Sequence, residues 1–483
     1  MENLSAIVNS LSPGEENLVR HFYKYKNFGE YRKRALLFEL LSKKNKNLTE
    51  SQAIKQLGYS SKSSFANVKI RLRSDVLSIL LMQESSTKFG TPYAQALFDC
   101  RRGLMQGEIL INRGVYQEAL DVLQKASKIA QKFEFFTELM QIEDLIRNYA
   151  MSNGCADDFI ALSASIRENY ASCGTFLEAK QKHYEISMPG LLGVKSFEEY
   201  SRKGSEMIRT SSPSSSSRTN FYNGLAALNY YSSIRDFEMA LKYAGPLLKS
   251  AETDPVVKSK SNQAGIHMDL ANIYLNRCEY DLAIRHSSRS VNLFKAGMIN
   301  QLQAYVILFF CYFRNGEYAK ASETLDAANE HRIIKSQQVP LMNSRLHFLR
   351  AGLTFSKGDY DETSNLLRDS TDLMKDKEGW MPGLFLLESL VLIEKNDIEL
   401  AIYKIDAFRK TLYRWGMDND EHRIGIITRL LRQIVRDNCD YAKIFKRQNN
   451  EIRLLSGESS KCYWDPAGYE IIRFDEWLLK KVS

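Results

Sequence analysis

Residues able to do covalent chemistry are sparse in this 483-residue chain, and their spacing forms no catalytic motif. Cys173 and His183 lie ten residues apart, but a thiolate–imidazole pair is defined by geometry and not by such a separation. The segment Gly190–Ser196 (GLLGVKS) has glycines but lacks the adjacent Gly-Lys and the spacing of a phosphate-binding loop. We therefore expect no enzyme activity, no catalytic residue and no cofactor.

Histidine and cysteine are too dispersed to indicate a metal centre. None of the seven histidines stands at metal-ligand spacing with a cysteine. The seven cysteines are widely spaced and lack a C-x-x-C pair, which favours reduced thiols over a secreted disulfide framework. The most apolar run, Ala304–Phe313, is far shorter than the ~18 residues of a membrane-spanning helix. The N-terminal residues lack the features of a signal peptide, so we expect a cytoplasmic protein with no membrane insertion.

Charge points to a binding surface near the N-terminus. The first 80 residues hold 14 Lys or Arg against 7 Asp or Glu, whereas the remainder holds 52 against 51. Nearly all of the net charge of +8 therefore belongs to one short region. Such a local excess is a candidate patch for nucleic acid.

The basic region has the helix spacing of a helix-turn-helix. Thr49 begins a short helix with a capping box, Gly58 ends it, and Ser60 or Ser61 begins a longer one. In the longer helix an apolar stripe would face the core, consisting of Phe65, Val68, Leu72, Val76 and Ile79. In a DNA reader the polar face would meet bases and the basic side chains phosphates. The candidate nucleic-acid contacts are Lys62, Ser63, Asn67, Lys69, Arg71 and Arg73.

Two other interpretations of this region stay open. Helix pairs with a glycine turn occur throughout α-helical proteins, and basic side chains often flank an apolar stripe without binding anything. Ile70 on the proposed reading face is also a poor choice for DNA. These points favour a protein-docking or capping module for this region, and RNA or ribosome contact is a further alternative.

The rest of the chain is organised as a repeat. An apolar helix, a short turn, an aromatic or aliphatic residue and then a small residue recur, with turns at positions 114, 235, 278, 316, 358 and 396. Weaker copies are expected near Gly154 and residue 195. A left-handed residue ends the first helix of each pair, and small residues allow the two helices to cross closely. The residues that carry this pattern include Gly107, Gly114, Tyr116, Ala119, Ala271, Tyr280, Ala283, Gly316, Tyr318, Ala321, Gly358 and Tyr360.

This Gly–Tyr–Ala pattern resembles the tetratricopeptide repeat (TPR), over roughly residues 95–420. The resemblance implies an all-α, right-handed TPR-like α-solenoid of about eight helix pairs. The sequence departs from the family in its period, which is nearer 40 than 34, and in Phe309, which occupies a position that should be small. We expect a basic helical module over residues 1–90, helical repeats over 91–445 and a C-terminal capping segment over 446–483.

Two further expectations concern binding and the chain end. In a TPR array the first helices line a groove for a peptide or helix, which here would include Met268, Asp269, Asn272, Gln303, Val306, Phe310 and Phe313. The aromatic C-terminal segment would cover the last repeat, because a solenoid must bury its end face. Together these parts are similar to a bacterial TPR-like family of unknown function.

The sequence thus favours a non-enzymatic scaffold or adaptor that binds a protein or peptide segment. The alternative is a helix-turn-helix/TPR transcription regulator. Its N-terminal module would bind DNA, and its solenoid would sense a peptide or protein.

Overall fold

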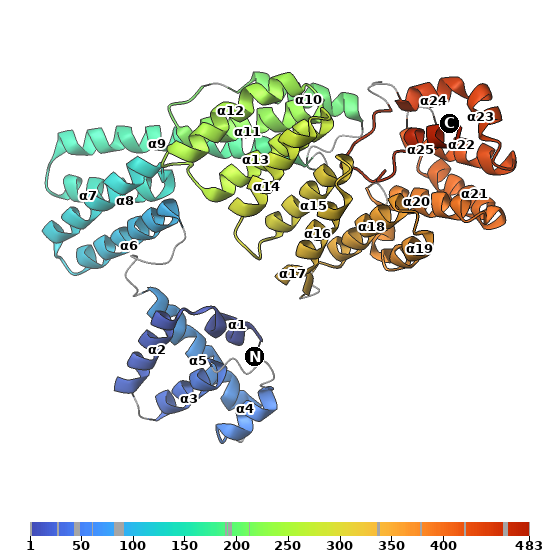
Figure 1. The fold of residues 1–483 in the computed structure, drawn as a ribbon. Coiled ribbons are helices and arrows are strands. Elements are labelled where there is room, and N and C mark those ends of the chain that lie inside the picture. The colour runs from blue at the N-terminus through green and yellow to red at the C-terminus, as the bar shows by residue number, and fades with distance from the viewer. Residues whose placement is uncertain are drawn as a thin grey trace. The chain divides into compact units, whose positions relative to one another are not determined.

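The computed structural model describes residues 2–26, 29–42, 49–59, 61–81, 91–188, 191, 196–211, 213–335, 339–376, 379–419, 422–456 and 462–482. All regular structure among these residues is helical (Figure 1), so the predicted all-α class is confirmed. The chain forms two compact units, Met1–Asp99 and Cys100–Ser483. Each unit has its own hydrophobic core, and each is described separately below.

The first unit is a small helical bundle. Its helices are α1 (Glu2–Ser10), α2 (Pro13–Tyr25), α3 (Glu30–Ser42), α4 (Glu50–Gln56) and α5 (Lys62–Leu81). Capping boxes at Ser12 and Thr49 start α2 and α4, as their sequences predict. The apolar stripe of α5 is buried along its whole length, so this helix forms the centre of the bundle.

The second unit is built from successive antiparallel helix pairs. It begins within α6 (Pro92–Asn112) and continues through α7 (Tyr116–Phe133), α8 (Phe136–Ser152), α9 (Ala156–Ser187), α10 (Phe197–Arg209), α11 (Ser217–Ser233), α12 (Phe237–Thr253), α13 (Lys260–Asn276) and α14 (Tyr280–Leu293). The array goes on with α15 (Ile299–Arg314), α16 (Tyr318–Asn329), α17 (Arg332–Lys335), α18 (Pro340–Ser356), α19 (Tyr360–Arg368), the 3-10 helix η2 (Thr371–Lys375), α20 (Met381–Glu394), α21 (Ile398–Arg414) and α22 (Arg423–Arg436). Three short helices follow, α23 (Tyr441–Arg447), α24 (Asn449–Ser456) and α25 (Phe474–Val482).

The helix pairs repeat the local geometry that the TPR-like pattern predicts. Gly114, Gly316 and Gly358 have φ of 75°, 76° and 81°, and Arg235, Cys278 and Asn396 adopt the same left-handed conformation without being glycine. Gly154 is left-handed as well, with φ of 73°, and residue 195 lies outside the described residues. The chain is therefore a TPR-like helical repeat protein.

Two kinds of side chain fix how the paired helices meet. The residue two positions after each left-handed turn is the first residue of the second helix, as for Tyr280 in α14 and Tyr318 in α16. Tyr318 packs back on Phe313 of the first helix, with ring centroids 5.5 Å apart. At the close crossing of α6 and α7, a Cβ on Gly107 would lie 2.4 Å from Cδ2 of Leu123, so only glycine fits there.

Candidate functional site

The C-terminal segment lies on the repeats rather than beside them. After α24 the chain returns at Cys462, forms an extended loop, and ends in α25 (the dark red trace in Figure 1). We call Cys462–Ile471 the C-terminal loop. The surface that it covers on the first helices α15, α18, α20 and α22 is the loop face, marked by Arg314, Arg345, Gly352, Gly383 and Arg423.

The two ends of the C-terminal loop are anchored by a buried arginine. Arg423 of α22 donates to both carboxylate oxygens of Glu470, at 2.5 and 3.0 Å, and to Asp475 at 2.7 Å. It also donates to the carbonyls of Leu455 and Cys462, at 2.6 and 3.1 Å. All three charged side chains are less than 10% exposed. Burial of this network fixes where the loop leaves and rejoins the core.

A second arginine binds the main chain of the loop. Arg314, at the end of α15, donates to the carbonyl oxygens of Pro466, Ile471 and Glu470, at 2.9, 2.7 and 3.3 Å. Its guanidinium lies 4.5 Å from the ring centroid of Trp464 and 5.2 Å from that of Phe313. Burial lowers the pKa of Arg314 to about 10, against the raising effect of Glu470. Because every peptide has backbone carbonyls, such contacts bind a peptide through its main chain and not through its side chains.

Glycines in the first helices make room for the loop. A Cβ on Gly383 of α20 would lie 2.3 Å from the carbonyl oxygen of Tyr469. A Cβ on Gly352 of α18 would lie 2.2 Å from Cδ1 of Ile471. The loop backbone therefore lies directly on α20, and the Ile471 side chain lies directly on α18, where a larger residue at either glycine would require the loop to shift.

The tip of the loop, Tyr463–Gly468, is more open than its ends. Asp465–Gly468 is a tight turn, in which the Asp465 carbonyl and carboxylate accept from the amides of Gly468 and Ala467, both at 3.0 Å. The side chains of Tyr463 and Asp465 are exposed, although the residues around them, Cys462 and Pro466, are buried. A short polar turn is thus held against the repeats by its flanks.

Three arginines from different repeats act electrostatically on the Asp465 carboxyl. Although this side chain is exposed at the surface, the dense packing around it desolvates the carboxyl and raises its pKa, and the charges of Arg314, Arg235 and Arg345 act in the opposite direction. Arg235 lies 4.3 Å from the ring centroid of Tyr463, and Arg345 lies 3.9 Å from that of Trp380. We call Arg235, Arg314 and Arg345 the arginine trio.

The predicted groove residues differ in how deeply they are buried. Val306, Phe310 and Phe313 are buried in the core, so their assignment to an open groove is wrong. Their helix is packed on more than one side, and Phe310 and Phe313 also lie beneath Arg314. Gln303 is exposed, and Met268, Asp269 and Asn272 are half-buried on α13. Burial raises the pKa of the Asp269 carboxyl to about 7.

Helical periodicity places the exposed Gln303 on the loop face. Residues seven or eleven positions apart lie on the same side of an α-helix. Gln303, Phe310 and Arg314 therefore form one stripe of α15, and Arg345 and Gly352 form one stripe of α18. Within each stripe, the C-terminal loop contacts the later residues, Arg314 and Gly352.

The C-terminal segment, which the sequence predicts to cover the last repeat, reaches well beyond that repeat. Tyr441 of α23 packs against Trp477 of α25, which does cover the end of the array. Trp477 and Lys481 also reach Glu394 of α20, at 2.7 and 2.8 Å. The loop then extends to Arg235, more than two hundred residues earlier in the sequence. Sequence reasoning had no signal for this, because the contacts repeat with no period.

The candidate nucleic-acid contacts lie on one helix and divide into two groups. Lys62, Ser63, Asn67 and Arg73 are exposed on α5. Lys69 pairs with Glu50 at 2.9 Å, and Arg71 pairs with Glu30, so carboxylates of the same unit already offset these two charges. Ser61 caps α5 by accepting from the Ser64 amide at 3.2 Å, while Ser60 lies outside the described residues.

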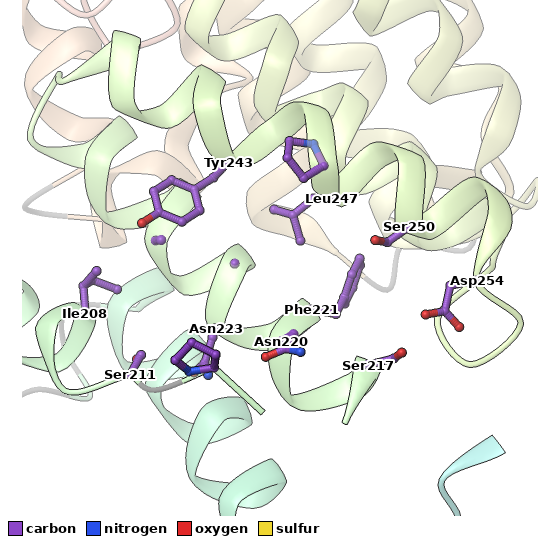
Figure 2. A pocket seen from close by; sticks show the side chains of 14 residues that line it. Ile208, Ser211, Ser217, Asn220, Phe221, Asn223, Tyr243, Leu247, Ser250 and Asp254 are labelled. Atoms are coloured by element: carbon purple, nitrogen blue, oxygen red, sulfur yellow. The ribbon is translucent and has the colours of Figure 1, made fainter. Parts of the chain in front are cut away.

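A separate pocket lies between α11 and α12 (Figure 2). Phe221 and Leu247 line it, together with polar side chains that include Asn220 and Asp254. Asn220 is engaged with the backbone of Ser214, donating at 2.6 Å and accepting at 3.0 Å, and Asp254 accepts from the Val256 amide at 2.9 Å. These local bonds shape the connecting loops, and we assign no ligand to this pocket.

Candidate metal sites, disulfides and membrane-spanning helices are absent from the described residues. No group of three or more His, Cys, Asp or Glu side chains there is arranged to hold a metal ion. Each of the seven cysteines is a free thiol. In the same part of the chain, no helix is both long and apolar enough to cross a membrane.

Comparison with known proteins finds similarity among solved structures. No protein-family model matches the sequence. No curated protein matches it either. Among solved structures, the TPR domain of P58(IPK) is matched with 12% sequence identity, over 80% of this chain and 99% of that domain, at a TM-score of 0.23.

Proposed function

We propose that this protein is a non-enzymatic scaffold that binds an extended segment of a partner protein on the first helices of its TPR-like repeats. One observation carries the proposal. The loop face already holds an extended stretch of polypeptide, whose carbonyls accept hydrogen bonds from Arg314 and whose backbone lies on Gly383. A surface with these contacts is suited to main-chain recognition of a peptide.

Photo-crosslinking in the native cell tests this function directly. A photoreactive amino acid at Gln303 would lie on the exposed part of the loop face. The matched control is Tyr403 on the second helix α21, which is 70% exposed. We expect a discrete protein adduct from position 303 and none from position 403. Equal labelling from both positions, or from neither, contradicts the proposal.

A second function, nucleic-acid binding by the first unit, is supported by one feature of α5. Its first turns present Lys62, Ser63 and Asn67 to solvent, while the opposite stripe is buried. A helix N-terminus with exposed polar side chains is the part of a recognition helix that reaches base edges. This favours the transcription-regulator alternative for that unit.

Duplex binding at low salt tests this second function. We expect full-length protein to bind DNA with an affinity that falls steeply with salt, and the triple variant Lys62→Ala, Asn67→Ala, Arg73→Ala to lose it. The control Lys24→Ala, Lys55→Ala removes the same charge from exposed positions of α2 and α4. Equal loss in both variants would indicate non-specific charge attraction, and no binding at low salt ends this proposal.

A further inference from the structure

The tip of the C-terminal loop is held differently from its ends. At the ends, Glu470 and Cys462 are buried and bonded to Arg423. At the tip, Tyr463 and Asp465 are exposed, and the turn hydrogen bonds lie within the turn, while one bond from Arg314 to the Pro466 carbonyl holds the tip to the repeats. The tip can therefore leave the surface by giving up the Arg314 bond, while the buried network at Arg423 that anchors the loop stays intact.

The site beneath the tip contains an arginine, Arg345, with a hydrogen-bond donor that has no acceptor among the described residues. Arg345 stacks on Trp380, and its Nε is buried without a hydrogen-bond partner among the described residues. Burial lowers its pKa to about 10, which means that its charge is maintained at a desolvation cost. An arginine in this state gains from a carboxylate that can bond to it in a bidentate manner. Asp465 is near enough to influence Arg345 electrostatically, yet no bond joins them.

We infer that the loop face takes from a partner protein a segment in which an aromatic residue is followed by a carboxylate. The tip, with Trp464 and Asp465, occupies that site in cis until the segment displaces it. The aromatic ring replaces Trp464 over Arg314, and the carboxylate enters the arginine trio. This inference rests on the proposed function and adds the chemistry of the partner and the gating of its site.

Charge and position favour this occupant. The charges of three arginines from separate repeats favour the charged form of one carboxyl, so the site favours negative charge. Arg235 and Arg314 also each face an aromatic ring of the tip, at 4.3 and 4.5 Å. The exposed Gln303 continues the same stripe of α15 beyond Arg314, which leaves room for a longer segment than the tip supplies.

Fluorine NMR on the full chain labelled with 5-fluorotryptophan tests the inference. Of the four tryptophans, Trp464 and Trp380 lie at the site, Trp477 lines the same cavity as Trp464 and Arg314, and Trp415 serves as the remote control. The probe is a synthetic peptide with the sequence of residues 462–470, with serine in place of Cys462. Trp464→Phe assigns the Trp464 signal.

We expect the peptide to shift the Trp464 and Trp380 signals and to leave the Trp415 signal unchanged. A tethered segment competes at an effective concentration on the order of millimolar, so several millimolar peptide displaces a measurable fraction of the tip. The same peptide with Asn in place of Asp465 should bind at least tenfold more weakly. No shift at that concentration, or equal potency of the Asn peptide, overturns the inference.

Matched protein variants separate the site from general stability. Arg345→Met should weaken the peptide response at least tenfold, whereas Arg350→Met, on the same helix but paired with Asp326, should leave it unchanged. Circular dichroism checks that both variants fold. Equal responses in the two variants overturn the role of the trio. Crosslinking from position 303 without peptide displacement would leave the scaffold function standing and reject the gate alone.

Discussion

At the scale of single residues, the most consequential side chain is Arg423. It is 7% exposed, and its charge is matched by Glu470 and Asp475, which are also buried. Burial works against the charged form, but the bonds to these two carboxylates outweigh it and raise the pKa of Arg423 above its ordinary value. Such a network contributes to stability only while it is complete, because removing one partner leaves a buried charge.

Glu470→Ala should therefore destabilise the protein strongly. We expect a loss of about 3–5 kcal/mol in the free energy of unfolding, since Arg423 stays buried without its bidentate acceptor. The control is Glu476→Ala, an exposed partner of Arg473, for which we expect less than about 1 kcal/mol. Urea unfolding followed by tryptophan fluorescence measures both. Similar losses in the two variants would mean that the network adds nothing to loop anchoring.

A histidine pair between α13 and α14 links stability to pH. Nδ1 of His267 lies 2.9 Å from Nδ1 of His286, so one nitrogen donates and the other accepts. Burial, followed by the nearby His286 and Arg289, lowers the pKa of His267 to about 4. Burial likewise lowers the pKa of His286. The neutral pair is therefore the form that the folded state prefers.

The sign of the pH effect follows from these pKa values. Between about pH 6.5 and 4 the unfolded chain binds protons at these histidines that the folded chain does not, so stability falls as the pH falls. We expect His267→Gln to unfold with a shallower pH dependence than the unchanged protein across that window. Urea midpoints at pH 7.5 and 5 measure the difference. An unchanged slope would show that His267 binds protons equally in the folded and the unfolded chain.

At the scale of elements, the left-handed turns end the first helix of each pair. Cys278 has φ of 59°, a conformation that costs a residue with a Cβ about 1 kcal/mol and costs glycine nothing sterically. Gly316 has the same role with φ of 76°. The sequence pattern alone locates both turns, because turn chemistry is local.

Exchanging residue types at these two turns should change stability in opposite directions. Cys278→Gly relieves the strain, and we expect a gain of about 0.5 kcal/mol after the extra entropy of the unfolded glycine. Gly316→Ala introduces the strain, and we expect a loss of about 1 kcal/mol. A Cβ added at Gly316 would hit no neighbour, because no heavy atom lies within 4 Å of where it would stand. Thermal unfolding midpoints that move in the same direction would contradict this account.

The features that could be predicted from the sequence all depend on interactions that are local in the chain. Capping boxes, turn residues, helix starts and the buried stripe of α5 all depend on residues within a few positions of one another. The groove prediction failed at Val306, Phe310 and Phe313 because periodicity gives a face of a helix but not what covers it. Aromatic content predicted that the chain end is packed and left its destination open.

At the scale of the whole molecule, the loop face is assembled from distant parts of the chain. Arg314 and Ile471 are 157 residues apart, and Glu394 and Trp477 are 83 apart. No pattern in a single sequence specifies such pairs, since neither residue type nor spacing repeats. The site therefore emerges only from the fold, whereas the repeats that carry it are visible in the sequence.

The two compact units offer a last prediction, which concerns cooperativity. All four tryptophans lie in the second unit, so their fluorescence reports that unit alone, whereas circular dichroism reports helices of both. The first unit buries a much smaller core, and small cores supply less stability. We expect the dichroism signal to begin falling at a lower urea concentration than the fluorescence.

A repeat array can itself lose cooperativity, so a variant in the first unit is needed to assign the early phase. Arg34 pairs with Asp75 at 2.6 Å, and Tyr23 donates to the same carboxylate at 2.8 Å. Arg34→Met leaves this carboxylate without its counter-charge, and it should move the early dichroism phase to lower urea while the fluorescence midpoint stays fixed. If both signals shift together, the units unfold as one cooperative body. If only the dichroism shifts, the basic unit is a module that unfolds independently of the repeats.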